Sequence, residues 1–96
     1  MAQFDLYYLD TMLVVDLQSD FIGLDHSRIV APLREAARYE FLPRLTPEVT
    51  VNGKPLVVHI HDLAAVPSRQ LGPPVGDLRE AADDLLRAMD ILTRGF

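Results

Sequence analysis

The feature that most constrains the fold is an Asn-Gly pair in the second half of the chain. Asn52 and Gly53 lie between two short runs rich in apolar residues, 49–51 and 56–58, and the second arm can extend from 56 to about 66. Both residues accept the positive φ angles of a tight two-residue turn, so the two runs are predicted to pair as an antiparallel hairpin. We expect the second arm to end where Pro67 interrupts it.

Other short runs repeat this β-type pattern. Residues 3–9 alternate apolar and polar side chains, and 12–17 are apolar and β-branched, which predicts an antiparallel hairpin joined by a short connection. Residues 28–32 predict a third strand, ended or placed at a sheet edge by its proline. We expect a single helical turn or a loop over 33–42 and one more short strand over 68–71.

Only the C-terminal segment has a helical period. Five apolar residues of 78–92 fall on one helical face, namely Leu78, Ala82, Leu85, Met89 and Leu92. Asp77 is placed to cap the N-terminus of this helix, with Glu80 three residues on, and Gly95 is placed to end it. The pattern predicts a mainly β (α+β) protein, with antiparallel strands followed by one C-terminal helix.

Composition limits the possible functions. The 96 residues suit one domain, 1–96, and the net charge of −5 disfavours nucleic acid as the main partner. Because Cys is absent, disulfides, thiolate metal sites and a thiol nucleophile are excluded. The chain has no apolar run of about 18 residues and no basic flank before an apolar stretch, so we expect no membrane span and no signal peptide. These features are compatible with a cytoplasmic protein.

Two groups of residues raise the question of catalysis. Asp16 and Asp20 would lie about 13 Å apart along an extended strand, too far for a paired acid and base, so we assign them to turns or surface contacts. A basic group, comprising Arg28, Arg34, Arg38 and Arg44, has the charge to hold an anion or RNA phosphate. It lacks an accompanying aromatic stacking platform. We therefore predict no catalytic residues.

A histidine-rich run suggests metal binding only weakly. His59 and His61 share a face of the predicted second hairpin arm, as two zinc ligands would need, and Asp62 follows them. His26 is the candidate for a third ligand. Spacing alone is weak evidence, so we assign these histidines to surface or dimer contacts and predict no metal site.

Two segments are candidates for partner contact. Phe21 and Ile22 are adjacent, so in an extended chain they face opposite sides, and one of them should face solvent or a partner. Phe96, the last residue, either covers the apolar face or forms an exposed contact point with its carboxylate.

The whole chain resembles the CcdB family, the toxin of a bacterial toxin–antitoxin pair. The Gln3-Phe4 opening matches the family, residues 14–20 (VVDLQSD) resemble its V-D-V-Q-S-D segment, and 28–33 (RIVAPL) resemble its R-M-V-I-P-L strand. Further matches follow in order at Leu45, Pro47, Asp62, Ala64, Val66, Pro67, Gly72, Val75, Asp77, Leu78, Ala88 and Gly95.

The resemblance implies a fold, partners and a mode of action. The expected fold is an SH3-like, partly open antiparallel barrel with a small side sheet and one C-terminal α-helix. The expected protein is a homodimer without cofactors or enzymatic activity. It would bind DNA gyrase A and trap the cleaved-DNA complex, meeting DNA only through gyrase or its antitoxin. A cognate CcdA-like antitoxin would neutralise it and, with it, repress their operon.

The family's gyrase-binding positions can be transferred residue by residue. They correspond to Phe21, Ile22, Asp90, Arg94, Gly95 and Phe96. Asp90 stands where the family has Asn, and Arg94 stands where it has a Trp that stacks on a gyrase arginine. An arginine there loses the cation–π contact and adds like-charge repulsion.

Two alternatives follow from the same resemblance. An mRNA-cleaving endoribonuclease toxin shares this barrel and would use Arg28, Arg34 or Arg38 beside a Thr, His or Asp acid/base. A non-toxic relative would bind only an antitoxin, as the loss of the family's Trp at position 94 suggests.

Overall fold

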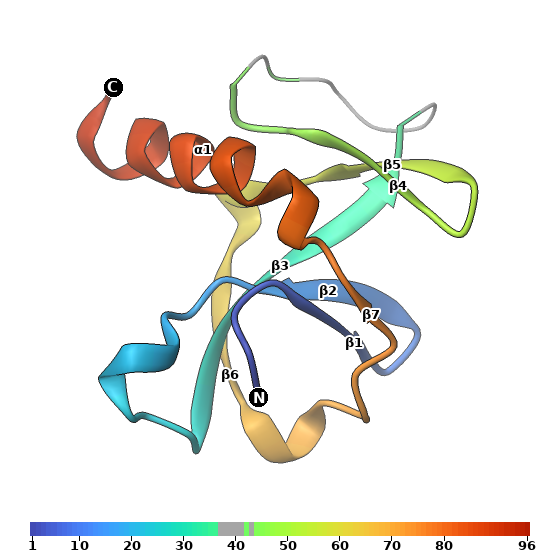
Figure 1. The fold of residues 1–96 in the computed structure, drawn as a ribbon, viewed down its shortest axis with the longest axis vertical. Helices are drawn as coiled ribbons and strands as arrows, with labels where there is room; N and C mark the ends of the chain where they lie inside the picture. Colours follow the sequence, from blue (N-terminus) through green and yellow to red (C-terminus); the bar gives the residue numbers. More distant parts are fainter. Residues whose placement is uncertain (37–41, 43) are drawn as a thin grey trace.

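A curled antiparallel sheet and one α-helix make up the molecule (Figure 1). The computed structural model describes residues 1–36, 42 and 44–96. The strands are β1 Asp5–Leu9, β2 Met12–Asp16, β3 Ser27–Glu35, β4 Glu48–Val51, β5 Lys54–Val58, β6 Ala64–Pro67 and β7 Gly76–Asp77. Their order in the sheet is β4-β5-β3-β2-β1-β7, and β6 pairs with β3 outside this path.

Both predicted hairpins are present. β1 and β2 pair antiparallel with Leu6 opposite Val15, and β4 and β5 pair with Val51 opposite Lys54. In the second turn Asn52 has φ 51° and Gly53 has φ 79°, the positive angles that this residue pair was expected to supply.

The second arm of that hairpin is shorter than predicted. β5 ends at Val58, a 3-10 turn, η2 (Ile60–Asp62), follows, and β6 is a separate strand, so a single arm over 56–66 is wrong. β5 pairs with the C-terminal part of β3 and β6 with its N-terminal part. Because β3 curls between these two regions, the chain has to be redirected by a turn.

β3 is longer than predicted, because Pro32 does not end it. Leu33 to Glu35, expected in a helical turn or loop, continue the strand and pair with β5. Pro32 is tolerated because the strand changes partners there: it pairs with Val14 on one side, and its carbonyl accepts the His59 amide at 2.9 Å on the other. The rest of that prediction falls largely on 37–41 and 43, outside the described residues.

The predicted strand over 68–71 is also wrong. Ser68–Gln70 form a 3-10 turn, η3, after which Leu71 makes a single bridge to Leu9. The Ser68 amide and hydroxyl are already used by the loop before β3, since they donate to the carbonyls of His26 and Asp25.

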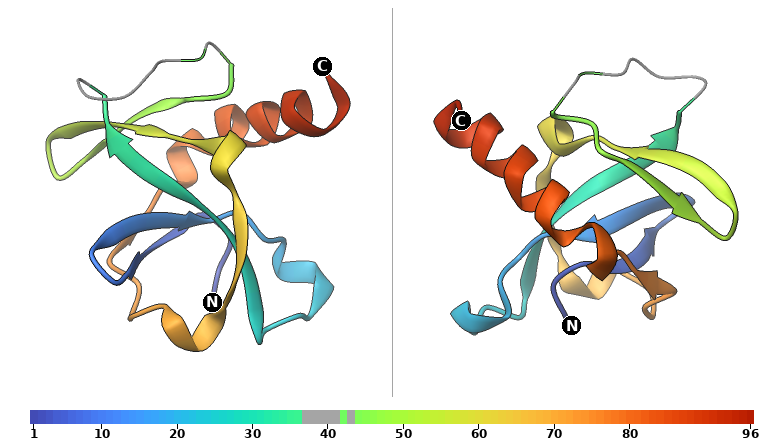
Figure 2. Two further views of the ribbon diagram at one scale, coloured as in Figure 1. Left: turned by 180° about the vertical axis from the view of Figure 1, so that it is seen from behind. Right: turned by 45° about the horizontal axis from the view of Figure 1, so that its top comes forward.

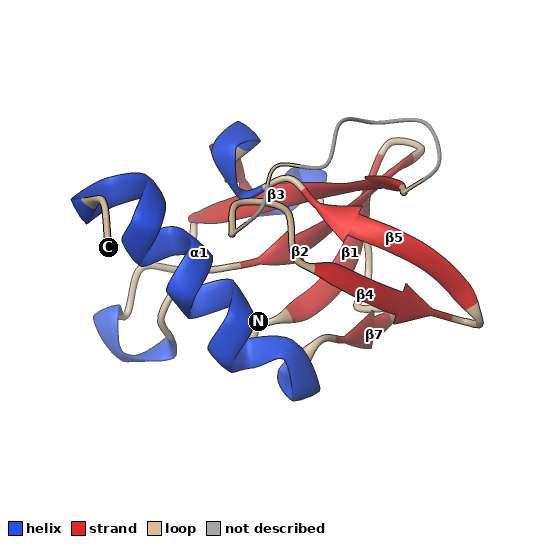
Figure 3. Cartoon of the chain, turned by 90° about the horizontal axis from the view of Figure 1, so that it is seen from above, coloured by secondary structure: helices blue, strands red, loops and turns tan. Residues whose placement is uncertain are grey.

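The C-terminal helix is confirmed, but it begins at Ala82 and not at Leu78, and no side chain of the described residues caps its N-terminus. α1 (Ala82–Arg94) follows a 3-10 turn, η4 (Arg79–Ala81), and Asp77 Oδ1 accepts the Arg79 amide at 3.0 Å. Gly95 ends the helix with φ 85°. α1 crosses the curled sheet (Figure 3), and its Leu85 and Ala88 are fully buried.

The helix closes the main core, and a second, smaller buried cluster comprises Tyr7, Val14, Val30 and Leu71. The core joins side chains of the sheet, η2 and α1, namely Phe4, Leu6, Val15, Leu17, Ala31, Leu33, Leu56, Val58, Ile60, Leu78, Leu85 and Ala88. A half-barrel with a side sheet of β4, β5 and the end of β3, together with one C-terminal helix, confirms the mainly β, SH3-like fold. No helix of the described residues has the length and apolar character needed to cross a membrane.

Candidate functional site

The segment between β2 and β3 presents two apolar side chains to solvent. Phe21 is 99% exposed and Ile22 is 59% exposed. They lie in a 3-10 turn, η1 (Asp20–Ile22), so the extended conformation assumed for this segment is wrong and both side chains face outward. Gly23 ends the turn with φ 67°, in the left-handed region.

A buried ion pair lies directly beneath this turn. The Asp16 carboxylate, at the end of β2, is fully buried and lies 2.7 Å from Arg28 Nε. Arg28, in β3, is itself only 2% exposed, and its Nη2 lies 3.8 Å from the Asp20 carboxylate in η1. The pair therefore joins β2, β3 and the start of η1.

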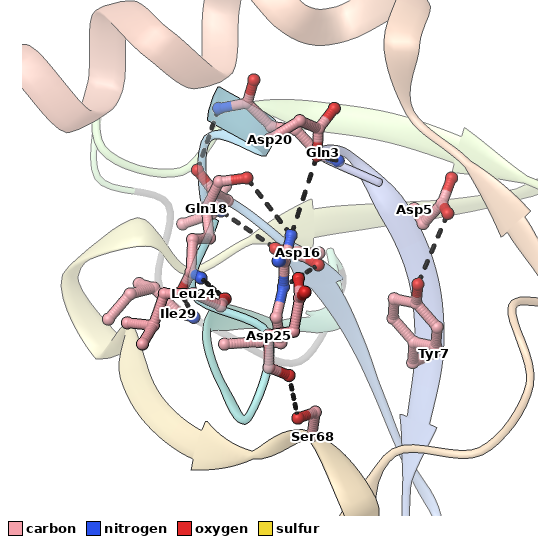
Figure 4. Close-up of polar contacts among 12 residues, drawn as sticks. Gln3, Asp5, Tyr7, Asp16, Gln18, Asp20, Leu24, Asp25, Ile29 and Ser68 are labelled. Carbon is pink, nitrogen blue, oxygen red and sulfur yellow. Dashed lines mark hydrogen bonds and ion pairs between the residues drawn. The ribbon is translucent and has the colours of Figure 1, made fainter. Parts of the chain in front are cut away.

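Gln18 completes this buried network (Figure 4). Its side-chain amide donates to the Leu24 carbonyl at 2.6 Å, and its Oε1 accepts the Ile29 amide at 3.1 Å. Its own amide donates to Asp16 Oδ1 at 2.9 Å. The loop that carries the two exposed apolar side chains is thus fixed at both ends.

The N-terminal residues also hold η1. The Gln3 amide donates to Asp20 Oδ1 at 2.7 Å, and its side-chain amide donates to the Leu17 carbonyl at 3.0 Å. Phe4 follows with φ 71° and is buried in the main core. The start of the chain therefore belongs structurally to the η1 region.

These contacts correct two sequence predictions. Asp20 lies in the η1 turn with a half-exposed side chain, as expected, but Asp16 is fully buried, and both carboxylates approach the guanidinium of Arg28. The group of four arginines considered for anion or RNA phosphate binding loses Arg28, which is buried in the ion pair with Asp16. Arg38 lies outside the described residues.

The tail of α1 forms a second exposed group. Arg94 Nη2 lies 3.4 Å from the Asp90 carboxylate one helical turn earlier, and its guanidinium carbon lies 5.4 Å from the centre of the Phe96 ring. Phe96 is 79% exposed, so it does not cover the apolar face of the molecule. The Gly95 amide donates to the Ile91 carbonyl at 3.0 Å and turns the chain toward this arrangement.

The loop and the tail lie on the same side of the molecule. Figure 1 and the reverse view in Figure 2 both show η1 and the C-terminus on one side, away from the turn of the β4–β5 hairpin. The six residues proposed from the resemblance thus occupy two exposed segments of that side.

The histidine run lies on a turn and not on the predicted strand. His59 is buried just before η2, while His61 and Asp62 lie within it. His26 precedes β3 beside Ser68, at the opposite end of β6 from η2, so it is not placed to join them.

A comparison with known protein families shows which family the chain belongs to. The family model described as CcdB protein matches residues 3–95. The chain belongs to the CcdB family. No curated protein matches the chain. Membership in the CcdB family makes this chain a toxin-type component of a toxin–antitoxin system, in a family that acts as a gyrase poison and not by catalysis of its own.

Sequence analysis did not identify the ion pair that fixes the loop carrying Phe21 and Ile22. Asp16 follows Val14 and Val15, and Arg28 precedes Ile29 and Val30, so each charge adjoins an apolar run. A charge in a buried strand requires a partner, and two opposite charges in such runs were the available signal. Which two strands would be neighbours was not evident from the residues alone.

Proposed function

We propose that this CcdB family member binds DNA gyrase A and traps its cleaved-DNA complex. The observation that carries the proposal is the near-complete exposure of Phe21 on a loop fixed by a buried ion pair. An aromatic side chain has only two χ angles to order on binding and buries a large area, as interface anchors do. Ile22 beside it extends the apolar contact.

The tail supplies the second part of the proposed gyrase contact. Asp90, Arg94, Gly95 and Phe96 would meet gyrase together with the loop of a partner protomer or of the same chain. In the free tail Arg94 is neutralised by Asp90 and lies over Phe96. Like-charge repulsion from Arg94 is thereby reduced, and the apolar Phe96 ring is left to anchor the tail.

The remaining partners follow from the family. We propose that residues 1–96 form a single domain and that the protein is a homodimer acting in the cytoplasm. A cognate CcdA-like antitoxin neutralises it, and together they repress their operon. An antitoxin segment that folds on binding would gain its affinity from broad apolar contact. DNA is met only through gyrase or the antitoxin.

Expression without the antitoxin, with gyrase from the same host, tests the main proposal. We expect growth arrest and accumulation of cleaved DNA, both strongly reduced in Phe21→Ala. Tyr8→Ala is the matched control, since Tyr8 is a half-exposed aromatic residue in β1 outside the proposed contact. Thermal unfolding of each variant establishes that it is folded. Full trapping by folded Phe21→Ala would contradict the assignment.

A second experiment tests the tail. Arg94→Trp restores a stacking side chain and should strengthen binding to a gyrase A that presents an arginine by about two- to thirtyfold. Arg87→Trp is the control, because Arg87 is also exposed on α1 and also pairs with an aspartate one turn away, Asp84. Equal gains from both variants would mean that Arg94 is not at the contact.

The engagement of Arg94 within its own chain also favours a second candidate. In a family member that binds the antitoxin but not gyrase, Arg94 would contact Asp90 and Phe96 of its own chain, as it does here. It is distinguished by antitoxin binding without gyrase binding. The endoribonuclease alternative loses support from the burial of Arg28, and absence of RNA cleavage by the purified protein would dismiss it.

A further inference from the structure

The η2 turn gathers two imidazoles and a carboxylate. His59, His61 and Asp62 each offer one ligand atom, and these atoms lie within 4.8 Å of one another. None of the three belongs to the positions assigned above to gyrase. The group is therefore independent of the proposed function.

Both rings turn a nitrogen toward the same oxygen. Asp62 Oδ2 lies 3.4 Å from His59 Nδ1 and 3.9 Å from His61 Nε2, and the two ring centres are 5.0 Å apart. Ligand atoms around a tetrahedral zinc ion, at about 2.0–2.1 Å from the metal, lie about 3.3 Å from one another. Because the side chains of His61 and Asp62 are 28% and 48% exposed, small rotations can close the remaining gap.

The turn holds these groups together before any ligand arrives. The His59 amide donates to the Pro32 carbonyl of β3 at 2.9 Å, and the Asp62 amide donates to the His59 carbonyl at 3.0 Å. Ile60 between them is fully buried in the main core. A ligand would therefore meet a backbone that is already ordered, which lowers the entropic cost of binding.

One ring nitrogen of the group is buried without a hydrogen-bond partner in the described part of the chain. Among the described residues, His61 Nδ1 is buried and has no hydrogen-bond partner. Buried polar atoms without partners are rare, and each calls for a ligand, a water or an ion. In the neutral ring one nitrogen carries the proton and the other keeps a lone pair, so a proton on Nδ1 leaves the lone pair of Nε2 directed toward Asp62, where a cation can bind.

We propose that His59, His61 and Asp62 form a binding site for one divalent transition metal ion, with Zn²⁺ as the expected ion. Neutral imidazole nitrogens and a carboxylate suit Zn²⁺, and three protein ligands with a water complete its usual tetrahedron. Mg²⁺ and Ca²⁺ prefer sites made of oxygen and should not bind here. Because η2 packs beside β3 and α1, a bound ion would stabilise the folded state at the point where the helix meets the sheet.

Calorimetric titration of the full chain with Zn²⁺, and separately with Mg²⁺, tests the site. We expect one Zn²⁺ per chain, no binding of Mg²⁺, and a higher thermal midpoint with Zn²⁺. His61→Ala and Asp62→Asn change side chains that are not fully buried, and each should weaken Zn²⁺ binding at least about tenfold. His26→Ala is the matched control and should bind Zn²⁺ like the original protein.

Each other outcome overturns the proposal. Absence of Zn²⁺ binding would mean that the three side chains only hydrogen-bond with one another. Unchanged affinity in folded His61→Ala or Asp62→Asn would remove that residue from the site. Equal weakening by His26→Ala would indicate nonspecific binding of zinc by exposed histidines.

Discussion

Asp16 carries its charge at a fully buried position, and Arg28 is its ion-pair partner at 2.7 Å. Removing two charges from water is costly. Here the cost is offset by the short contact, by the Gln18 amide, which donates to Asp16 Oδ1 at 2.9 Å, and by the Gln18 carbonyl, which accepts from Arg28 Nη2 at 3.4 Å. The pair also fixes the loop before β3. The same two residues therefore contribute to folding stability and hold Phe21 in its exposed position.

The first prediction concerns this pair. Asp16→Asn leaves the Arg28 charge buried without its counter-ion and should lower the free energy of unfolding by about 3–5 kcal/mol. Asp20→Asn, the control, changes a half-exposed carboxylate 3.8 Å from the same guanidinium and should cost less than about 1 kcal/mol. Urea denaturation of both variants measures the difference. Equal losses would show that the Asp16 contact is not the dominant one.

The second prediction concerns Tyr7. Burial in the sheet, and secondly the nearby Asp5 and Asp16 carboxylates, raise the pKa of the Tyr7 hydroxyl above its ordinary value of 10.0. The folded protein therefore holds this proton more tightly than the unfolded chain. Stability should fall as the pH rises past about 10, because the unfolded state then loses the proton first.

Urea denaturation across this pH range, repeated on variants, identifies the source of that loss. Tyr7→Phe has no hydroxyl to ionise and should show a smaller decrease in unfolding free energy above pH 10. Tyr8→Phe, with the half-exposed neighbour changed instead, should behave like the original protein. A Tyr7→Phe curve that falls as steeply as the original would exclude Tyr7 as the cause.

Among the secondary-structure elements, α1 closes the core and carries the tail. Leu85 is fully buried against the sheet, while the next residue, Leu86, is 42% exposed. The helix therefore has one face fixed by packing, and its last turn, with Arg94, extends from that support.

The third prediction compares these two leucines. Leu85→Ala removes buried methyl groups and leaves a cavity, so it should lower the unfolding free energy by about 2–5 kcal/mol. Leu86→Ala makes the same chemical change at the surface and should cost less than about 1 kcal/mol. Thermal or urea unfolding measures both. Similar losses at the two positions would mean that the helix does not pack on the sheet by its Leu85 face.

At the scale of the whole molecule, a small core coexists with many exposed apolar side chains. A chain of 96 residues buries roughly two-thirds of its unfolded surface. Large apolar residues remain exposed at Met1, Tyr8, Phe21, Ile22, Leu24, Val75, Leu86, Leu92 and Phe96. Exposed apolar surface of this kind marks interaction sites, and the proposed two-fold, gyrase and antitoxin contacts would use it.

The fourth prediction follows from the proposed homodimer. Sedimentation at micromolar concentration should give twice the 10.8 kDa mass of one chain. Phe21→Ala should leave this mass unchanged, because Phe21 is assigned to gyrase and not to the two-fold contact. A monomer at every accessible concentration would contradict the homodimer. If only Phe21→Ala sediments as a monomer, Phe21 lies in the dimer interface.

Sequence patterns predicted the structure correctly where a turn-forming residue pair or a helical spacing of apolar residues specifies one conformation. Asn52-Gly53 specified its hairpin because few other residue pairs adopt two positive φ angles readily. The 78–92 period specified α1 because a one-sided apolar stripe has to face a core. Errors arose at Pro32 and at 56–66, where pairing with a curled central strand overrode the local pattern.

The sequence by itself determined the β-then-helix order, the two hairpin turns, the left-handed end of α1 and the family. These depend on backbone preferences and periodicity, which act over a few residues. Only the tertiary structure decided that Asp16 and Arg28 meet, that Phe21 and Ile22 both face solvent, and that the His59 group shares one carboxylate. The Asp16–Arg28 contact joins two strands whose pairing no local preference specifies. The other two features depend on the 3-10 turns η1 and η2, which replace the extended conformation that the local pattern predicted.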